Sequence, residues 1–338
     1  MKPKGLFSIL PEAKAGESST GNRWLIIISV ILAVLFLYLA LRDMDWEIFF
    51  NTLKNAQYAF LPIIFLWSSA SFLIRALRLR VLLTSEKEIS IFNVFWANMA
   101  GYLGNSILPA RAGEFVRAAY LSRQNSLSVS YALAVGLVER LMDLIALIVL
   151  GSLALSTTGI VSPVFQSALK GISILGLIGL AAIFILPYFG GLTRKLIMTF
   201  PLLKDTGRIK LDQFLQQFLV GLKSLHNFSR VMQFAGLTGL IWLMDAIGTV
   251  FLAYILKIPL LLQQAFVLLA ALGLSSAIPS TPGYVGVYQF VAVTTLMPFG
   301  VLQADALAYI LISQILGYII IGFWGLLSFW QFNRHIAA

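Results

Sequence analysis

Cysteine is absent from the 338-residue chain, and charged residues make up only 11% of it. The absence of cysteine excludes disulfides, thiol catalysis and cysteine-ligated metal sites. The shortage of charge accompanies 59% hydrophobic residues and a mean hydropathy of +0.90, a composition typical of polytopic membrane proteins and not of soluble domains. The two histidines, His226 and His335, have no neighbours in the sequence suited to binding a metal. We therefore expect neither a cofactor nor a metal.

The net charge of +10 raises the question of nucleic acid, but the cations lie mostly at the ends of apolar segments. That placement follows the positive-inside rule, so we expect no nucleic-acid binding. The sequence also contains no GxxxxGK[ST] phosphate-binding loop, so ATP is not expected as a direct energy source.

Six apolar runs are long enough to cross a bilayer, at about residues 24–41, 58–83, 128–155, 166–189, 231–256 and 304–332. Residues 1–23 form a polar tail. Basic residues cluster in this tail, in the segment 194–210, after residue 332 and at the end of the second run, which carries Arg75, Arg78, Arg80 and Lys87. The pattern predicts a multi-pass protein of the plasma (inner) membrane with both termini in the cytoplasm.

Two further apolar stretches, about 91–121 and 262–298, are too broken by Gly, Asn and Pro to be ordinary spans. We interpret each as a re-entrant hairpin of two half-helices. They match at an offset of 170 residues, because Pro279 falls on Pro109 and Gly283 on Gly113. The expected bends involve Asn105, Pro109 and Gly113 in the first hairpin and Pro279, Pro282 and Gly283 in the second.

Each half, 24–160 and 161–333, therefore contains three spans and one hairpin. Three crossings is an odd number, so the second half should be inverted relative to the first. Inverted repeats with broken helices are the architecture in which secondary transporters build a site near the midplane. The predicted fold class is an all-α polytopic membrane protein with six spanning helices and two re-entrant broken-helix hairpins in an inverted repeat.

Ionisable residues inside a membrane are functional candidates by default. In the first hairpin, Arg111, Glu114 and Arg117 are spaced three apart, which places them on one face of a helix that starts after Pro109. Arg111 and Arg117 together are suited to holding a phosphate through bidentate hydrogen bonds. Glu114 would limit the excess charge and orient one arginine.

The third span carries Glu139, Arg140 and Asp143 about 17 Å from its cytoplasmic end, close to the bilayer centre. Glu139 and Asp143 share a face and repel each other, so they require a cation between them or a proton on one of them. Arg111 or Arg117 is the expected cation. The alternative for all these charges is a buried network that fixes the hairpin in the bundle and contacts no substrate.

Three other features carry open interpretations. Asp245 lies mid-span and corresponds to Arg75 at the same offset, which suggests a structural ion pair. The second hairpin carries Tyr284, Tyr288 and Gln289, which are suited to lining a polar, neutral path. The alternative is that the hydroxyl residues of this hairpin only satisfy backbone groups freed by the prolines. Residues 208–228 predict an amphipathic helix, either on the inner leaflet or packed against the bundle or a partner.

The motifs LPARAGEFVRAAYL, VERLMDLIAL and PSTPGYVGVYQ occur in an order that resembles the lysylphosphatidylglycerol synthase transmembrane, or flippase-like, family over about residues 24–332. The resemblance implies a lipid-flipping membrane module, with Arg111, Glu114, Arg117, Glu139, Arg140 and Asp143 on the matching motif positions. The soluble aminoacyl-transferase domain of the best-known members is not seen after the last apolar run. We therefore expect neither the synthase activity nor its lipid as substrate.

The leading hypothesis is a lipid flippase that moves an anionic phospholipid or a polyprenyl-phosphate-linked lipid between leaflets, with the head group held by midplane arginines and carboxylates. On this hypothesis the protein is not an enzyme. The alternatives are an intramembrane lipid-modifying enzyme and a membrane anchor for a separately encoded glycolipid or phospholipid enzyme. The partners expected are membrane lipids, together with either a second copy of the chain or such an enzyme.

Overall fold

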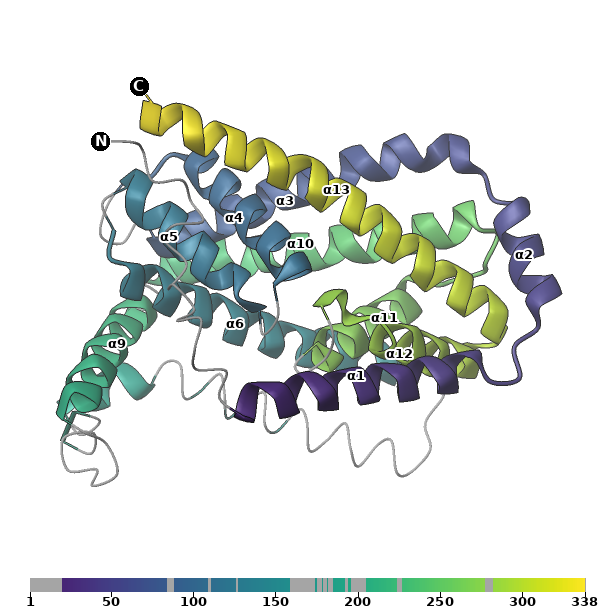
Figure 1. Ribbon diagram of the computed structural model, residues 1–338, viewed down its shortest axis with the longest axis horizontal. Coiled ribbons are helices and arrows are strands. Elements are labelled where there is room, and N and C mark those ends of the chain that lie inside the picture. Colours follow the sequence, from purple (N-terminus) through teal and green to yellow (C-terminus); the bar gives the residue numbers. More distant parts are fainter. Residues whose placement is uncertain are drawn as a thin grey trace.

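A computed structural model gives the fold of the chain (Figure 1). It describes residues 20–83, 88–108, 111–125, 127–158, 185–191, 205–223, 227–276 and 282–337, and a few single positions between 174 and 195. Within these ranges the chain forms helices and no strand. The α-helices are α1 Thr20–Leu41, α2 Trp46–Lys54, α3 Leu61–Leu83, α4 Ile91–Ile107, α5 Gly113–Asn125, α6 Val129–Ser156, α9 Asp205–Lys223, α10 Phe228–Ile255, α11 Leu262–Ser275, α12 Val287–Leu296 and α13 Gln303–Ala337.

Side chains before several helices fix where these helices begin. The Asp45 carboxylate accepts hydrogen bonds from two backbone N–H groups in the first turn of α2. Ser128 caps α6 in the same way, and Asn227 caps α10. Each cap satisfies a donor that the helix itself leaves without a partner.

Within the described residues, three helical stretches are long and apolar enough to cross a membrane, namely Tyr58–Leu83, Phe228–Ile255 and Gln303–Arg334. The 28-residue α6 is as long, but it carries three charged residues near its middle. The predicted span 166–189 lies for the larger part outside the described residues. The chain is thus a helical membrane protein, while the number of six spans stays a prediction.

Both predicted broken elements fold as pairs of short helices. In the first, α4 and α5 run antiparallel in close contact, because Gly113 lies against Gly101 and Gly104. A methyl group on Gly104 would lie 2.8 Å from the Gly113 Cα. In the second, α11 and α12 pack against each other across the turn that contains the short 3-10 helix Pro282–Tyr284.

The two helix pairs lie toward opposite ends of the molecule, and α13 runs past both (Figure 1). Near its C-terminal end, Ser328 donates a hydrogen bond to the Trp96 carbonyl in α4. Nearer its middle, the Tyr318 hydroxyl donates to the Gly283 carbonyl at the turn of the second pair.

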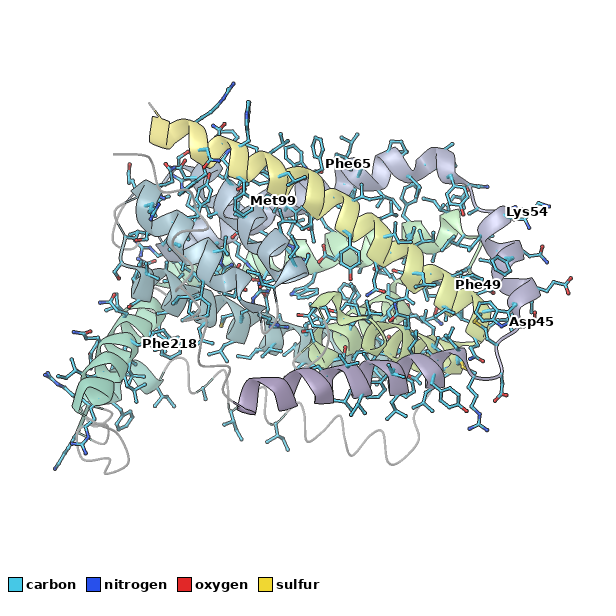
Figure 2. The ribbon with its side chains drawn as sticks, viewed as in Figure 1. Asp45, Phe49, Lys54, Phe65, Met99 and Phe218 are labelled. Atoms are coloured by element: carbon cyan, nitrogen blue, oxygen red, sulfur yellow. The ribbon has the colours of Figure 1, made fainter. Side chains whose placement is uncertain are left out.

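Two apolar cores follow this division. One is built on α4, α5 and α6 and contains Met99, and the other is built on α10 to α13 and contains Phe49 from α2 (Figure 2). Residues of α13 contribute to both, with Phe332 in the first core and Leu307 in the second.

The amphipathic helix predicted at about 208–228 is present as α9, which is described from Asp205 to Lys223. Asn227 caps the next helix, α10. Phe218 and Leu222 are buried in the first core, since α9 packs on α6 (Figure 2). Leu211, nearer the start of α9, is exposed. The C-terminal half of α9 is therefore part of the bundle.

Candidate functional site

Six charged side chains from α3, α5 and α6 form one continuous network inside the bundle. Arg78 of α3 lies between the two carboxylates of α6. Its Nη2 donates to Glu139 Oε1 at 2.9 Å and to Asp143 Oδ2 at 3.0 Å, and its Nη1 bonds the other oxygen of Asp143. Only 1% of the Arg78 side chain is exposed. A cation does lie between Glu139 and Asp143, but it is Arg78 and not the expected Arg111 or Arg117.

Arg117 of α5 extends the network from the other side of Glu139. Its Nη1 donates to Glu139 Oε2 at 2.8 Å, and its Nη2 lies 2.7 Å from Glu114 Oε2. Gly136 makes room for this guanidinium, because a methyl group there would collide with Nη2 of Arg117. Arg140 completes the network through Nη2, which donates to Glu114 Oε1 at 2.9 Å.

The network contains three cations and three carboxylates and is neutral as a whole. Within it Arg78, Arg117 and Glu139 are almost fully buried, whereas the Arg140 side chain is 32% exposed. Burying paired charges leaves little net stabilisation, but removing one partner exposes the full desolvation penalty of the other. The arrangement therefore ties α3, α5 and α6 together in one geometry.

Arg111 lies apart from this network, at the tip of the first helix pair. The prediction that it shares a helix face with Glu114 and Arg117 is wrong, because α5 begins only at Gly113. Arg111 itself has a left-handed backbone with φ of 56°, a strained conformation for a residue with a Cβ. Its side chain consequently points away from Glu114 and Arg117 and toward the second helix pair.

The Arg111 guanidinium is exposed and has neutral partners. Nη2 donates to the Ser276 carbonyl at 2.9 Å and to the Ser276 hydroxyl at 2.6 Å, while Nε donates to the Tyr284 hydroxyl at 3.1 Å. Among the residues that the structure describes, no carboxylate lies in ion-pair contact with Arg111. The tips of the two helix pairs thus meet at a cation whose charge is not neutralised locally.

The second tip is also strained and aromatic. Tyr284 has φ of 60°, and its ring stacks on that of Tyr288 with centroids 4.7 Å apart. The Gly283 carbonyl accepts hydrogen bonds from Gln314 and Tyr318 of α13. Gln289 is buried, accepts the Gly286 N–H at 2.6 Å and donates to Gln314. Gln289 therefore holds the turn together, and the two tyrosines are the part of this tip that lies beside Arg111.

The predicted bend residues are placed in part. Asn105 in α4 lies directly beside Gly113, and Pro282 begins the 3-10 turn that contains Gly283. Pro109 and Pro279 lie outside the described residues. The Ser275 and Ser276 hydroxyls donate to the Leu272 and Gly273 carbonyls, three residues earlier, and the Ser276 hydroxyl also accepts from Arg111.

The ion pair predicted between Arg75 and Asp245 is confirmed. The two side chains are in direct contact between α3 and α10, and the Ser71 hydroxyl donates to the other Asp245 oxygen at 2.9 Å. Trp67 on the same face of α3 donates to the Met244 carbonyl at 2.8 Å. This cluster joins the two halves of the chain.

Sequence reasoning missed Arg78 and Ser276. Arg78 was counted among the basic residues at the cytoplasmic end of the second span, and its spacing of three from Arg75 was the available signal of a shared buried side.

No cluster of three His, Cys, Asp or Glu side chains suited to a metal is found in the described part of the chain.

Residues 26–325 match the family described as the lysylphosphatidylglycerol synthase TM region. No curated protein and no solved structure matches the chain significantly.

Proposed function

Because the chain belongs to the lysylphosphatidylglycerol synthase transmembrane family, we propose that it moves an anionic phospholipid or a lipid-linked phosphate between leaflets. In this proposal the head group binds where the two helix tips meet, and the acyl chains stay in the bilayer. The transport requires no chemical change of the lipid.

The observation that carries the proposal is the pairing of Arg111 with neutral oxygens. A phosphate oxygen is a stronger acceptor than a carbonyl or a hydroxyl, because the hydrogen bond is then charge-assisted on both sides. A phosphate that displaces Ser276 and Tyr284 from Arg111 would gain that difference and separate the two tips. Binding of the head group would thereby be coupled to movement of the two halves.

The buried network supports the same division of roles. Arg78 and Arg117 are held by Glu139, Asp143 and Glu114, so they are structural in this proposal. Arg140 is the exception, since its side chain is partly exposed. It is the second cation that a head group at the tips would reach.

An inverted repeat is the architecture we propose for this movement. Packing pairs in the two halves correspond: α4 packs on α13 as α11 packs on α6, and α9 packs on α6 as α2 packs on α13. Arg75 and Asp245, in contact at the α3–α10 interface, are separated by 170 residues, the same offset as Pro109 and Pro279.

We also propose that the helix pairs are re-entrant and open to opposite sides, with six spans in all. The charge distribution supports a plasma-membrane orientation with both termini and α9 in the cytoplasm.

The test is leaflet exchange of head-group-labelled lipids in liposomes that contain the purified protein. We expect exchange of anionic lipids by the wild type, loss of exchange in Arg111→Ala and partial retention in Arg111→Lys, which keeps the charge but not the fork of donors. Arg42→Ala is the matched control, because Arg42 is an exposed arginine whose ion pair among the described residues is with its neighbour Asp43.

Other outcomes discriminate between the functions. No exchange of any lipid by folded wild-type protein, with or without a pH gradient, would reject an autonomous flippase and favour an anchor for a partner enzyme. A change in the chemical composition of the lipid would favour an intramembrane enzyme.

A further inference from the structure

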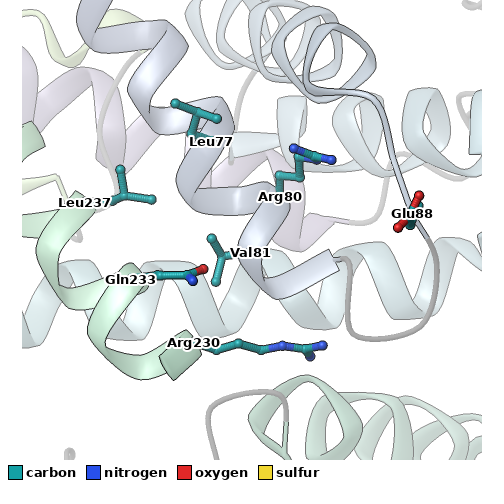
Figure 3. Close-up of a pocket in the computed structure, with 7 residues that line it drawn as sticks. All are labelled: Leu77, Arg80, Val81, Glu88, Arg230, Gln233 and Leu237. Carbon is teal, nitrogen blue, oxygen red and sulfur yellow. The ribbon is translucent and has the colours of Figure 1, made fainter. Parts of the chain in front are cut away.

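A second polar feature, separate from the helix tips, lies between the ends of α3 and α10. A cavity of about 550 Å³ opens there, within the size range of small-molecule sites. Figure 3 shows Arg80 of α3 and Arg230 of α10 projecting to the same side of the cavity, with Glu88 farther out. The lining of this cavity shares no residue with the contacts of Arg111 at the helix tips.

The cavity has a cationic end and an apolar wall. Arg80 is held in place because its Nε donates to the Ile89 carbonyl at 2.6 Å. In the described part of the chain no ion pair is formed by Arg230. Among the described residues of the lining, the two cations Arg80 and Arg230 face one carboxylate, Glu88. Leu77, Val81 and Leu237 supply the wall (Figure 3).

The apolar wall continues along both helices away from the arginines. On α3 the positions 73, 77 and 81 recur every four residues and are Leu, Leu and Val. On α10 the face that begins with Arg230 and Gln233 continues with Leu237 and Leu240. Leu73 and Leu240 are both exposed. The groove is therefore cationic at one end and apolar for about 10 Å of helical rise beyond it.

This pattern is absent from the other end of the same helix pair. The positions that correspond to Arg230 and Val81 at the offset of 170 are Phe60 and Phe251, whose rings are in contact at 6.3 Å. That end is aromatic and carries no arginine at the matching positions. Only one end of the α3–α10 pair is suited to an anion.

We propose that this groove binds an anionic phospholipid of the leaflet on that side, with its phosphate between Arg80 and Arg230 and an acyl chain along the leucine faces. A soluble anion would use only the cationic end. The apolar wall lies on two helices that are themselves apolar enough to cross a membrane, which favours a lipid. On the proposed orientation this is the cytoplasmic leaflet. The groove binds a lipid of that leaflet at a place separate from the helix tips, where transport is proposed.

The test is native mass spectrometry of the full chain in detergent, titrated with dioleoyl phosphatidylglycerol, with dioleoyl phosphatidylcholine and with sodium phosphate. We expect phosphatidylglycerol to bind at least tenfold more tightly than phosphatidylcholine, and Arg230→Gln to weaken it by about tenfold, the loss of one charge-assisted contact. Gln233→Glu should weaken it similarly by repulsion. Lys54→Gln, which removes an exposed cation at the far end of the bundle, should have no effect.

Titrations of Arg111→Ala separate this site from the helix tips, since the groove should still bind phosphatidylglycerol in that variant. The proposal is overturned by equal affinity for both lipids in the Arg111→Ala background, or by equal effects of Arg230→Gln and Lys54→Gln. Displacement of the lipid by sodium phosphate at similar concentration would show a soluble-anion site instead. None of these outcomes depends on whether the protein moves lipid.

Discussion

Removing Arg78 should destabilise the protein more than any other single change in the charge network. Arg78→Met keeps the volume and the apolar stem but leaves Asp143 with only Arg140, at 4.0 Å. Breaking a buried ion pair by removing one partner costs about 3–5 kcal/mol of unfolding free energy. Glu139 is less affected, because Arg117 remains 2.8 Å away. We therefore expect a loss at the lower end of that range.

The companion variant is Arg78→Met combined with Asp143→Leu. It removes one cation and one carboxylate, so the remaining network of two arginines and two glutamates stays neutral. Replacing both members of a buried pair by apolar residues is often neutral for stability, so the double variant should recover most of the loss. The coupling between the two sites should exceed about 2 kcal/mol.

The assay is unfolding of the purified protein in mixed micelles by increasing mole fraction of SDS, followed by far-ultraviolet circular dichroism. Arg42→Met is the control, since the Arg42–Asp43 pair is exposed and such pairs contribute about 0–1 kcal/mol. The reasoning is wrong if Arg78→Met unfolds within about 0.5 kcal/mol of the wild type. It is also wrong if the double variant loses the sum of the two single losses.

Three other substitutions test the packing. Gly113→Ala would place a methyl group against the Gly101 carbonyl of α4, so the thermal midpoint should fall by the equivalent of about 1–3 kcal/mol. Gly236→Ala is the control: a methyl group there would have no neighbour within 4 Å, so the midpoint should be unchanged or raised. Gln289→Leu strands a buried backbone N–H and should cost about 1–3 kcal/mol in the same SDS titration; an unchanged midpoint would contradict its role in the second tip. Leu222→Ala, at a side chain 1% exposed, should cost about 2–5 kcal/mol, while Leu211→Ala, 41% exposed, should change the midpoint little.

Much of the fold could be predicted because helix periodicity and glycine placement are local signals. The breaks between α4 and α5 and between α11 and α12 were predicted from the prolines, because proline cannot continue a helix without the loss of a backbone hydrogen bond. The Arg75–Asp245 pair was predicted from the offset of 170, on the hypothesis that the two halves are related and that these equivalent positions meet at their interface.

The partners in the charge network were harder to predict. Arg78 and Arg80 are two residues apart and look alike in the sequence, yet one is buried between two carboxylates and the other lines an open cavity. Which face of α3 turns inward depends on α6 and α10 packing over it, and this is a tertiary effect. Arg111 was assigned to the wrong face for a similar reason, because the exact start of a helix depends on its capping contacts.

The pair formed by Arg75 and Asp245 has a consequence for how the halves recognise each other. If the halves are related by the proposed repeat, these two positions lie on its two-fold axis, where in a symmetric dimer each residue would face its own copy. Two copies of the first half would then bring arginine against arginine, and two copies of the second would bring aspartate against aspartate. Like charges at such a contact oppose association. Because the first half carries an arginine and the second an aspartate at this one position, each half is a poor partner for a copy of itself and a good partner for the other half. Pairing of the two halves within one chain is therefore favoured over pairing of like halves from two chains.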